Sequence, residues 1–407
     1  MHPVDDIRGT LSRRLEGRTV VLGITGSIAA VECVHLAREL ARHGARVVAA
    51  MTQAAARIVH PDAIQFATGS PPVLQLTGDV EHVRWAGETN GRADLLLIAP
   101  ATANTIGKIA AGIDDTPVTT FATTAIGTGV PVVLAPAMHG TMWDHAQVLR
   151  NVERLKGLGV DVVMPREEEG KAKLATAETI VAHCVRALAP GGPLKGRRVV
   201  VVAGSTEEPI DGVRLISNRS TGALGCALAE EAFMRGADVL VLLGRHEVAP
   251  PPYVEVRHFT TVGSLAELAA TSVPHDAVAV LAAAAVGDYA MAHPHDGKVP
   301  SGKEAWDLHL VPAPKVLPVL RKAAPKATLV SFKLEVGADD VALEETARGR
   351  LGRAVEDIVV ANDLTRVTPG SHPAVILVAS EARAIQFAGP KEGLARAVLD
   401  AVERARG

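Results

Sequence analysis

The sequence predicts an α/β protein built from two Rossmann-like or flavodoxin-like three-layer domains with mainly parallel sheets. Short runs of β-branched residues alternate with longer stretches at helical spacing, a pattern typical of β-α units around a parallel sheet. The length of 407 residues exceeds that of one typical domain. Two segments, GRTVVLGITGS from Gly17 and GRRVVVVAGST from Gly196, open alike, so the sequence restarts about halfway along.

The composition is that of an ordinary globular protein, with 48% hydrophobic and 21% charged residues. A formal net charge of −3 gives no reason to expect nucleic acid or an acidic membrane surface as a partner. No apolar run approaches the roughly 18 residues that span a bilayer, and the first residues are charged rather than apolar. The three cysteines form no CxxC pair. We therefore expect a cytoplasmic chain without nucleic-acid or membrane partners.

The elements of the first half are expected from runs of Val, Ile and Leu for strands and from Ala-rich helical spacing for helices. Strands are expected at Thr19–Ile24, Ala45–Ala50, Leu95–Ala99 and Val130–Ala135, with a helix over Val31–Arg42. A Pro- and Gly-rich stretch without periodicity, APGGPLKG, predicts a linker at residues 189–196. It separates a first domain of residues 1–188 from a second domain of residues 197–407.

Both openings continue in the same way, with a helix that ends at a Gly-Ala pair and then a second apolar strand. The second copy carries extra residues between its first strand and its first helix, in Gly204–Gly225. This insertion lies beyond the carboxyl end of the predicted sheet, where α/β proteins bind ligands. We expect two nucleotide-binding-like domains, whether they arose by duplication or by convergence.

A candidate phosphate site follows the first strand, at GITGSIAA (residues 23–30). Its small residues let backbone N–H groups approach an anion at the start of a helix. The spacing matches neither the dinucleotide motif G-x-G-x-x-G nor the P-loop, so a mononucleotide is favoured over NAD or ATP. A tight strand–helix turn without a ligand is the alternative.

Polar and soft side chains also follow the later strands of the first half. PATANTIGK carries Thr102, Asn104 and Thr105 at a predicted helix start. PAMHGTMW carries two methionines, which suit the face of a flat heterocycle, although Met142 could equally belong to the core. His82 stands alone in a polar stretch, where a structural role is the more common one.

In this order, these motifs resemble the flavin-containing cysteine decarboxylases, and phosphopantothenoylcysteine decarboxylase in particular, over about residues 18–188. The resemblance implies FMN as cofactor and His82 and His139 as catalytic residues. It also implies a cofactor site formed by Gly26, Ser27, Ile28, Thr52, Thr102, Asn104, Thr105 and Met138. In this chemistry the flavin oxidises the substrate thiol, which creates an electron sink for the loss of CO₂.

Two departures from this family concern the substrate. His139 occupies a position at which the family carries asparagine. The segment Arg166–Ile180, which corresponds to the substrate flap, lacks the cysteine that bacterial relatives use to protonate the product. Lys171, Lys173 and water are the candidate proton donors.

In the second half, the insertion combines glycines, hydroxyls, Asn218 and arginines before a helix, a composition that suits phosphate oxygens. The apolar run 276–289 is expected to form a strand ending in Asp288, whose carboxylate can hold a divalent cation on a triphosphate. Lys298 and Lys303 follow in a loop, either as mobile charges suited to polyphosphate or as solvated surface lysines.

Together with AAAAVGDY, APK, SFKLE and VVAND, these motifs resemble phosphopantothenate–cysteine ligase over about residues 195–405. The resemblance implies Asn218 and Lys298 as catalytic residues and Asp288 as the ligand of Mg²⁺. It further implies a CTP site formed by Ala282, Ala283, Ala284, Asp288, Lys298, Pro314, Lys315, Val316, Leu317, Phe332 and Arg350.

The ligase half also departs from its family at lysine positions. Ala223 and Arg350 stand where lysine is usual, and a further such position falls on Arg353 or Ala354. One cationic contact of the nucleotide is therefore expected to be lost or supplied elsewhere.

The two resemblances together predict an enzyme of coenzyme A biosynthesis. The second domain would join 4′-phosphopantothenate to cysteine with CTP, through an acyl-cytidylate, and the first would decarboxylate the product to 4′-phosphopantetheine. The alternative is a ligase alone, with the first domain a non-decarboxylating FMN-binding or assembly module. Relatives form decarboxylase sites between the subunits of a trimer and pair their ligase domains as dimers, so we expect a homo-oligomer.

Overall fold

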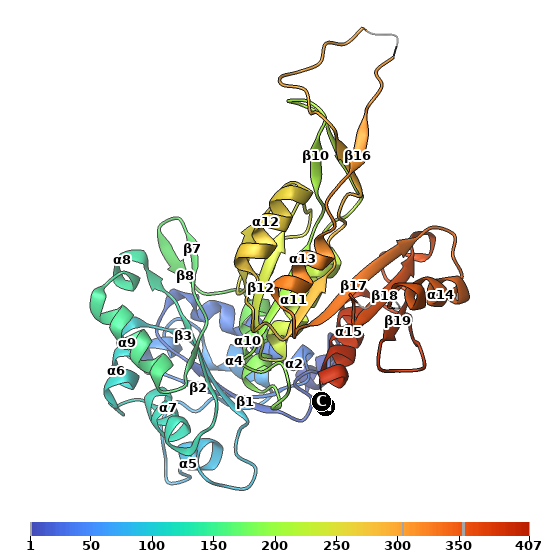
Figure 1. Cartoon of the computed structure of the whole chain (residues 1–407). Helices are drawn as coiled ribbons and strands as arrows, with labels where there is room; N and C mark the ends of the chain where they lie inside the picture. The colour runs from blue at the N-terminus through green and yellow to red at the C-terminus, as the bar shows by residue number, and fades with distance from the viewer. Residues whose placement is uncertain (1, 303–304, 352–354, 407) are drawn as a thin grey trace. The chain divides into compact units, whose positions relative to one another are not determined.

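The computed structural model describes residues 2–302, 305–351 and 355–406, and the chain divides into two compact units, residues 1–189 and 190–407. We call these unit 1 and unit 2. Each is a layered α/β structure with a mainly parallel main sheet (Figure 1), so the predicted fold class is confirmed. Residues 189–196 contain neither helix nor strand.

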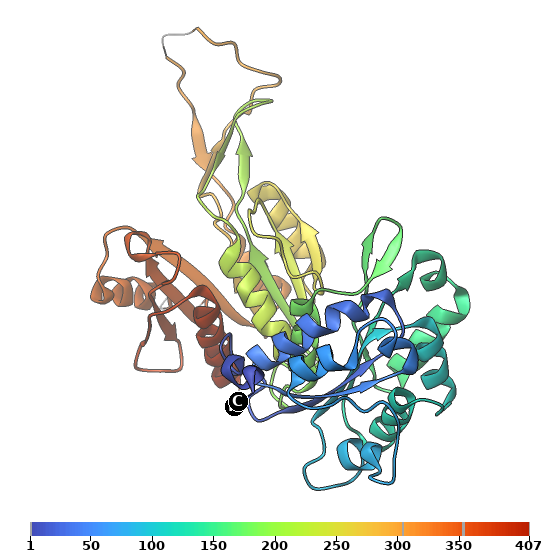
Figure 2. The ribbon, with the colours of Figure 1, turned by 180° about the vertical axis from the view of Figure 1, so that it is seen from behind.

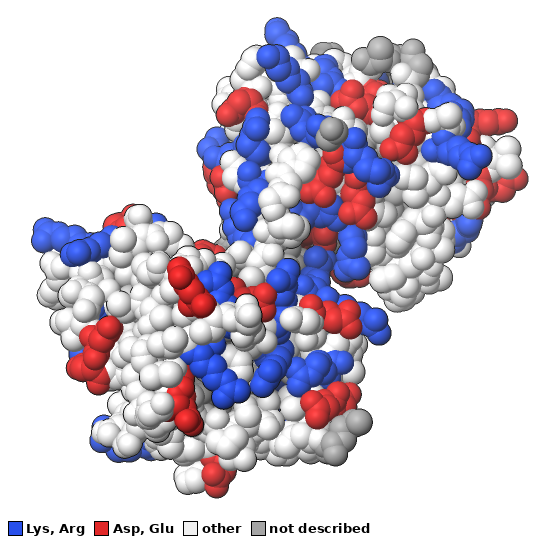
Figure 3. Space-filling view, turned by 90° about the horizontal axis from the view of Figure 1, so that it is seen from below, with Lys and Arg blue, Asp and Glu red and all other residues white. Residues whose placement is uncertain are grey.

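The exposed surface carries both signs of charge. On the face drawn in Figure 3, Lys and Arg side chains are interspersed with Asp and Glu. In the described part of the chain, no helix combines the length and the apolar character needed to cross a membrane.

All five strands of the main sheet in unit 1 are parallel, in the order β2-β1-β3-β4-β6. They are β1 (Thr19–Ile24), β2 (Arg46–Met51), β3 (Leu95–Ala101), β4 (Val132–Pro136) and β6 (Asp161–Val162). The four predicted strands are therefore confirmed, with small shifts at their ends. The strand order reverses direction between β1 and β3, and α/β proteins of this type bind ligands at such a switch point.

Helices cover the faces of this sheet, which explains why its strands are apolar along most of their length. In one layer α2 packs against α1, α4 and α10, and in the other α6 packs against α7 and α9. The helix predicted over Val31–Arg42 begins only at Cys33, because a 3-10 turn at Ile28–Glu32 precedes it. The helices are α1 (Pro3–Ile7), α2 (Cys33–Arg42), α3 (Gln53–Ala56), α4 (Pro61–Thr68), α5 (Glu81–Ala86), α6 (Ala103–Ala111), α7 (Pro117–Thr128), α8 (Gly140–Trp143), α9 (Ala146–Gly157) and α10 (Ala177–Ala187).

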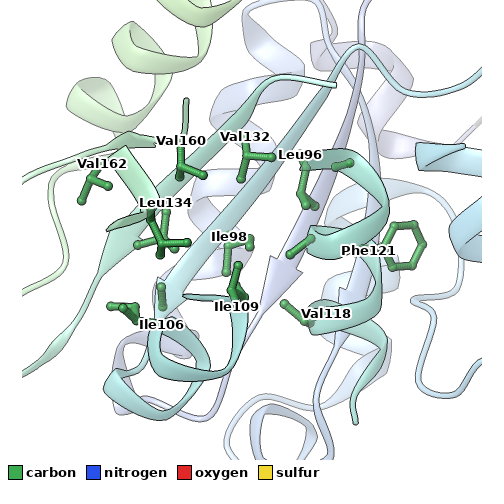
Figure 4. Close-up of a cluster of buried hydrophobic side chains, with 14 of the residues drawn as sticks. Leu96, Ile98, Ile106, Ile109, Val118, Phe121, Val132, Leu134, Val160 and Val162 are labelled. Carbon is green, nitrogen blue, oxygen red and sulfur yellow. The ribbon is translucent and has the colours of Figure 1, made fainter. Parts of the chain in front are cut away.

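The part of the core drawn in Figure 4 lies between the sheet and helices α6 and α7. Leu96 and Ile98 of β3 belong to one buried cluster with Ile106 of α6 and Phe121 of α7. Because aromatic residues make up only 3% of the chain, aliphatic side chains fill most of this core. Their packing fixes the positions at which α6 and α7 begin.

The predicted flap of unit 1 is a β-hairpin formed by β7 (Arg166–Glu168) and β8 (Lys171–Lys173). It adds to the two-residue strand β5 (Met138–His139), giving the antiparallel order β5-β8-β7. A side chain at Gly140 would place its Cβ only 2.3 Å from the carbonyl oxygen of Gly170 in the hairpin turn. Glycine at position 140 therefore permits the close approach between the hairpin and the chain that follows β4.

Unit 2 contains an eight-stranded sheet in the order β13-β12-β9-β14-β17-β18-β19-β20, in which only β19 and β20 run antiparallel to their neighbours. Helix α11 packs against α15, and α12 packs against α13. The strands are β9 (Arg198–Ala203), β12 (Asp238–Leu243), β13 (Glu255–His258), β14 (Ala279–Ala282), β17 (Thr328–Glu335), β18 (Ile358–Asp363), β19 (Ala374–Val378) and β20 (Ile385–Phe387). The helices are α11 (Ala223–Met234), α12 (Val262–Ser272), α13 (Val316–Ala323), α14 (Asp340–Leu351) and α15 (Lys391–Arg406).

The prediction of one strand running to Asp288 is wrong, because β14 ends at Ala282. The residues that follow are alanines, which have little preference for strands. The N–H of Ala283 donates to the carbonyl of Val202 at 2.9 Å, and the N–H of Ala285 donates to the carbonyl of Gly204 at 2.8 Å. These bonds lead the chain along the end of β9, so Asp288 lies in a loop.

Much of the predicted anion loop forms a projecting arm, made of residues 207–217, 289–302 and 305–312 (Figures 1 and 2). It contains two antiparallel ribbons, β10 (Glu207–Pro209) with β11 (Leu215–Ser217) and β15 (Tyr289–Met291) with β16 (Leu310–Pro312). The buried carboxylate of Asp211 joins them, because it accepts hydrogen bonds from the N–H groups of Val213, Arg214 and Val299. Burial alone would raise the pKa of Asp211, but these bonds outweigh it and hold the pKa well below its ordinary value.

Candidate active sites

The first candidate site is a cavity of about 980 Å³ in unit 1. Its walls come from the segments that follow β1, β2 and β3, so it lies at the switch point of the sheet. The cavity is lined by Gly26, Thr52, Gln53, Ala54, Arg57, Leu74, Gln75, Leu76, Thr102, Asn104, Thr105, Lys108, Asp114, Asp115, Thr116, Pro117, Thr119, Thr120 and Met142.

Three helix N-termini meet at this cavity, and each is capped by a threonine that lines it. Thr52 caps α3, Thr102 caps α6 and Thr116 caps α7. Their hydroxyls accept backbone N–H groups at 3.1, 3.3 and 3.2 Å, respectively. The remaining N–H groups of a helix start carry partial positive charge and attract anions. The arrangement fits a phosphate group held by backbone and hydroxyl donors.

Close packing of the loops after β1 and β3 fixes the floor of this site. The Thr25 hydroxyl is buried, donates to the carbonyl of Pro100 at 2.6 Å and accepts the N–H of Thr102 at 3.1 Å. A side chain at Gly26 would place its Cβ 2.5 Å from the Cβ of Ala54 in α3. Glycine at position 26 thus lets two helix starts come together around one ligand, which agrees with a bound FMN phosphate.

Five of the eight residues predicted to bind the cofactor line the cavity, and three do not. Ser27 instead caps the 3-10 turn by accepting the N–H of Ala29. Ile28 is 77% exposed. Met138 packs against the core and pairs with Ala172 of the hairpin, and Met142 lines the cavity in its place. The residues that line it as predicted are Gly26, Thr52, Thr102, Asn104 and Thr105.

The two predicted catalytic histidines do not line the first site. His82 is half-buried in α5, and its Nδ1 is fully buried without a hydrogen-bond partner among the described residues. His139 caps α8, where Nδ1 accepts the N–H of Thr141 at 3.4 Å. Nε2 is therefore the ring nitrogen that each histidine can offer to a substrate.

The hairpin places cationic side chains beside His139. Lys171 pairs directly with His139 across β5 and β8, and residues opposite one another in antiparallel strands share a face of the sheet. Lys173 donates to Glu169 at 3.2 Å and also pairs with Glu168 at 3.2 Å. These carboxylates, Glu168 foremost, raise the pKa of Lys173. Lys171 lies farther from a carboxylate, 4.0 Å from Glu169, so it is the better placed proton donor of the two.

The second candidate site is a cavity of about 670 Å³ in unit 2, between α13 and the β14–β17 part of the sheet. Asn218 and Asp288 lie on loops beside it, and the Asn218 amide donates to the carbonyl of Val286 at 3.1 Å. The predicted residues that line it are Asn218, Ala282, Ala284, Asp288, Pro314, Lys315, Val316, Leu317, Phe332 and Arg350. Ala283, between two lining residues, does not line it.

The second cavity has a buried floor and a charged mouth. At the floor, Val202, Leu320 and Ser331 are each 1% exposed, and Glu356 beside them is also buried. At the mouth, the Asp288 carboxylate and the Lys315 ammonium lie 2.6 Å apart with most of each side chain exposed. A flat heterocycle fits the apolar floor, and a charged phosphate chain fits the solvated mouth.

The predicted Lys298 does not reach this cavity, because it is exposed on the arm next to Gly297. Lys303, Arg353 and Ala354 lie outside the described residues. Within the described ranges, no group of three or more His, Cys, Asp or Glu side chains could hold a metal ion. A cation at Asp288 would need phosphate oxygens and water as its other ligands.

Sequence reasoning missed residues in both cavities. Thr116 could have been found, because Thr-Pro followed by a hydroxyl residue at the third helical position is a helix-start signal. Glu356 could not, since a single acid before a strand resembles many surface residues. Its place in the cavity depends on Arg350 and Ser331, which contact it from other elements.

Two family models match the chain, Flavoprotein over residues 8–189 and the DNA/pantothenate metabolism flavoprotein C-terminal domain over residues 194–405. The coenzyme A biosynthesis bifunctional protein CoaBC of Thermococcus kodakarensis is 45% identical over 408 residues, which cover 99% of each chain. The protein of that name from Methanocaldococcus jannaschii is 32% identical, over 99% of this chain and 98% of its own. A solved DNA/pantothenate metabolism flavoprotein from Streptococcus pneumoniae aligns with 51% of this chain and 99% of its own, at 26% identity and a TM-score of 0.46. The chain therefore belongs to the family of bifunctional coenzyme A biosynthesis proteins.

Proposed function

We propose that the chain catalyses two consecutive reactions of coenzyme A biosynthesis, one in each unit. Unit 2 joins 4′-phosphopantothenate to cysteine with CTP, and unit 1 decarboxylates the product to 4′-phosphopantetheine. The observation that carries this proposal is a cavity at the ligand-binding region of the sheet in each unit. Most of the residues predicted for the ligase reaction line the cavity of unit 2, and most of those predicted to bind FMN line the cavity of unit 1.

In the ligase reaction, the carboxylate of 4′-phosphopantothenate attacks the α-phosphorus of CTP and pyrophosphate leaves. The cysteine amine then attacks the acyl carbon of this acyl-cytidylate and CMP leaves. Asn218 would hold the acyl phosphate through its amide, which its bond to Val286 keeps at the cavity. Lys315 would offset charge on the phosphates, and Asp288 would hold Mg²⁺, which lowers the negative charge that the attacking carboxylate meets.

In the decarboxylase reaction, the helix starts capped by Thr52, Thr102 and Thr116 would hold the FMN phosphate. FMN supplies the reversible oxidation of the substrate thiol that makes loss of CO₂ possible. His82 would bind the cysteinyl part of the substrate through Nε2. His139 and Lys171, which share one face of the three-stranded sheet, would bind its carboxylate and deliver a proton during the final reduction.

We also propose that the chain works as a homo-oligomer, with trimeric contacts through unit 1 and dimeric contacts through unit 2. His82 lies outside the cavity of its own unit, which agrees with a site completed by a second copy. The arm exposes several large apolar side chains, a feature typical of contact surfaces, and it carries Lys298 away from the cavity of its own unit. The exposed apolar residues are Val213, Leu215, Tyr289, Trp306, Leu308 and Leu310.

The decisive assay gives the full-length protein each substrate separately. With phosphopantothenoylcysteine alone we expect release of CO₂ and formation of 4′-phosphopantetheine. With 4′-phosphopantothenate, cysteine and CTP we expect one pyrophosphate for each molecule of product. Pyrophosphate release without any CO₂ from phosphopantothenoylcysteine would favour the alternative of a ligase with an FMN-binding or assembly module. Absence of both reactions would contradict the proposal.

A further inference from the structure

We propose that Glu356 selects the nucleotide of the ligase reaction, by accepting a hydrogen bond from an exocyclic amino group of the base on its Oε2 atom. The residue would favour cytosine, which carries such a group at position 4, over uracil, which carries a carbonyl oxygen there. The inference rests on the proposed function in one respect, that a nucleoside triphosphate binds in the cavity of unit 2.

Glu356 is a buried acid held in a fixed position at the cavity wall. It lies just ahead of β18, separated from it by Asp357, and is 6% exposed. The Arg350 guanidinium donates to Oε1 through Nε at 3.0 Å and through Nη2 at 2.7 Å. The Ser331 hydroxyl lies 3.4 Å from the same oxygen. All these contacts involve one of the two carboxylate oxygens.

The other oxygen, Oε2, takes part in none of these contacts, and Glu356 lines the cavity. No side chain or backbone group of the described residues donates a hydrogen bond to it. Among the described residues, the fully buried side-chain atoms without a hydrogen-bond partner belong to Arg38, His82 and His372. Oε2 of Glu356 is not one of these atoms. A carboxylate oxygen without a donor in the wall of a cavity can accept a hydrogen bond from a bound ligand.

The depth of Glu356 decides which part of a nucleotide it can meet. It stands at the floor with Val202, Leu320 and Ser331, whereas the exposed Asp288–Lys315 pair marks the mouth. A triphosphate at the floor would lose its hydration beside Glu356, whose partner Arg350 is already engaged by the carboxylate, and this is unfavourable. A base at the floor would meet apolar side chains, the ring of Phe332 and one acceptor. We therefore place the base there and the phosphates at the mouth.

The chemistry of the two pyrimidines then sets the preference. Cytosine offers an amino donor at position 4, which glutamate accepts in known base recognition. Uracil offers an acceptor at that position, which would face Oε2 without a hydrogen and leave both groups unpaired. A hydrogen-bonding site rejects an analogue that lacks the donor more strongly than an apolar pocket rejects a change of size.

The test compares CTP with UTP in the full-length protein, by kcat/KM for pyrophosphate release and by Kd from calorimetry. We expect the wild-type chain to prefer CTP by about 10- to 100-fold. In Glu356→Gln, whose amide offers both a donor and an acceptor, the ratio should fall toward one. Glu344→Gln is the matched control, because it breaks a carboxylate–guanidinium pair with Arg348 on the same helix as Arg350, and its ratio should stay that of the wild type.

A measurement on the wild-type chain keeps the test independent of how well the variant folds. A CTP analogue without the 4-amino group should also bind more weakly than CTP, because it leaves Oε2 without a donor. Equal binding of CTP and this analogue, or equal weakening of CTP and UTP in Glu356→Gln, would overturn the role of Glu356 while leaving the ligase function intact. A wild-type chain that binds no nucleoside triphosphate would overturn both.

Discussion

Both units build a cavity from segments that follow strands of the main sheet, but the two cavities use different kinds of donor groups. In unit 1 three helix starts meet at the cavity, so backbone N–H groups and threonine hydroxyls form its anion site. Unit 2 relies on charged side chains, in the pairs Asp288–Lys315 and Arg350–Glu356. Substitutions other than to proline remove side-chain donors but leave the backbone N–H groups in place. We therefore expect single substitutions to affect ligand binding more severely in unit 2 than in unit 1.

The largest effect is expected for Asn218→Asp in unit 2. The substitution replaces the amide donor with a carboxylate beside the acyl phosphate, and loss of one such donor typically slows a reaction by about 100-fold or more. Ligation should fall more than pyrophosphate release, because the acyl-cytidylate forms before the amine attacks. Pyrophosphate and product are measured together, and decarboxylation of added phosphopantothenoylcysteine serves as the internal control. Unchanged ligation would contradict the role of Asn218.

A comparably large effect is expected for Lys171→Met in the hairpin of unit 1. Removal of a positioned proton donor slows proton transfer by about 100-fold, so the oxidised, decarboxylated product should accumulate. Mass spectrometry distinguishes it from the reduced product by two hydrogens. Lys173→Met is the matched control, since Lys173 lies two positions along the same strand and is held by Glu168 and Glu169. Equal effects of both substitutions would argue against a specific donor.

A moderate effect is expected for Thr102→Val at the start of α6. Loss of an N-cap costs about 1 kcal/mol of stability. Loss of the Thr102 hydroxyl from the cavity should weaken FMN binding by about tenfold. Thr176→Val is the matched control, because Thr176 caps α10 in the same way, with a 3.1 Å contact to Thr179, and does not line the cavity. Both variants should lose similar stability, and only Thr102→Val should lose affinity in a flavin fluorescence titration.

The smallest expected effect is a pH dependence of the free energy of unfolding that arises from His372 and involves no ligand. Burial lowers the pKa of His372 in unit 2 below its ordinary value of 6.5. The folded state then binds fewer protons than the unfolded state, so the free energy of unfolding should fall as pH drops below about 6.5 and should not change through this residue at higher pH. Thermal melts of the wild type and of His372→Leu would be recorded from about pH 5 to about pH 8, a range that brackets the ordinary histidine pKa. The melting temperatures of the two proteins should diverge only on the acid side. Parallel curves would exclude this contribution.

The sequence predicted the layers of both units because repeated apolar patterns determine strands and helices. Thr19–Ile24 became a largely buried strand as expected, since it consists mostly of residues that pack on a sheet. The run to Asp288 did not, because beyond Ala282 the chain keeps hydrogen bonds to Val202 and Gly204 but is no longer paired with β17. The residue pattern within one segment does not show which distant segments it will contact.

The site residues were predictable where they belong to a local motif and unpredictable where they depend on packing. Thr102 and Thr105 lie at a helix start that the sequence itself indicates. Met142 rather than Met138 lines the cavity, because β5 pairs with the hairpin and commits Met138 to the core. Glu356 faces the second cavity only because the Arg350 side chain holds it there. Both outcomes require knowledge of neighbours from other parts of the chain.

A single incubation tests whether one chain holds two separate catalytic cavities. The wild-type protein receives 4′-phosphopantothenate, cysteine and CTP, and His82→Asn receives the same mixture. For the wild type we expect one pyrophosphate and one CO₂ per 4′-phosphopantetheine. For the variant we expect pyrophosphate and phosphopantothenoylcysteine but little CO₂. Pyrophosphate without CO₂ from the wild type, or full CO₂ release from His82→Asn, would contradict it.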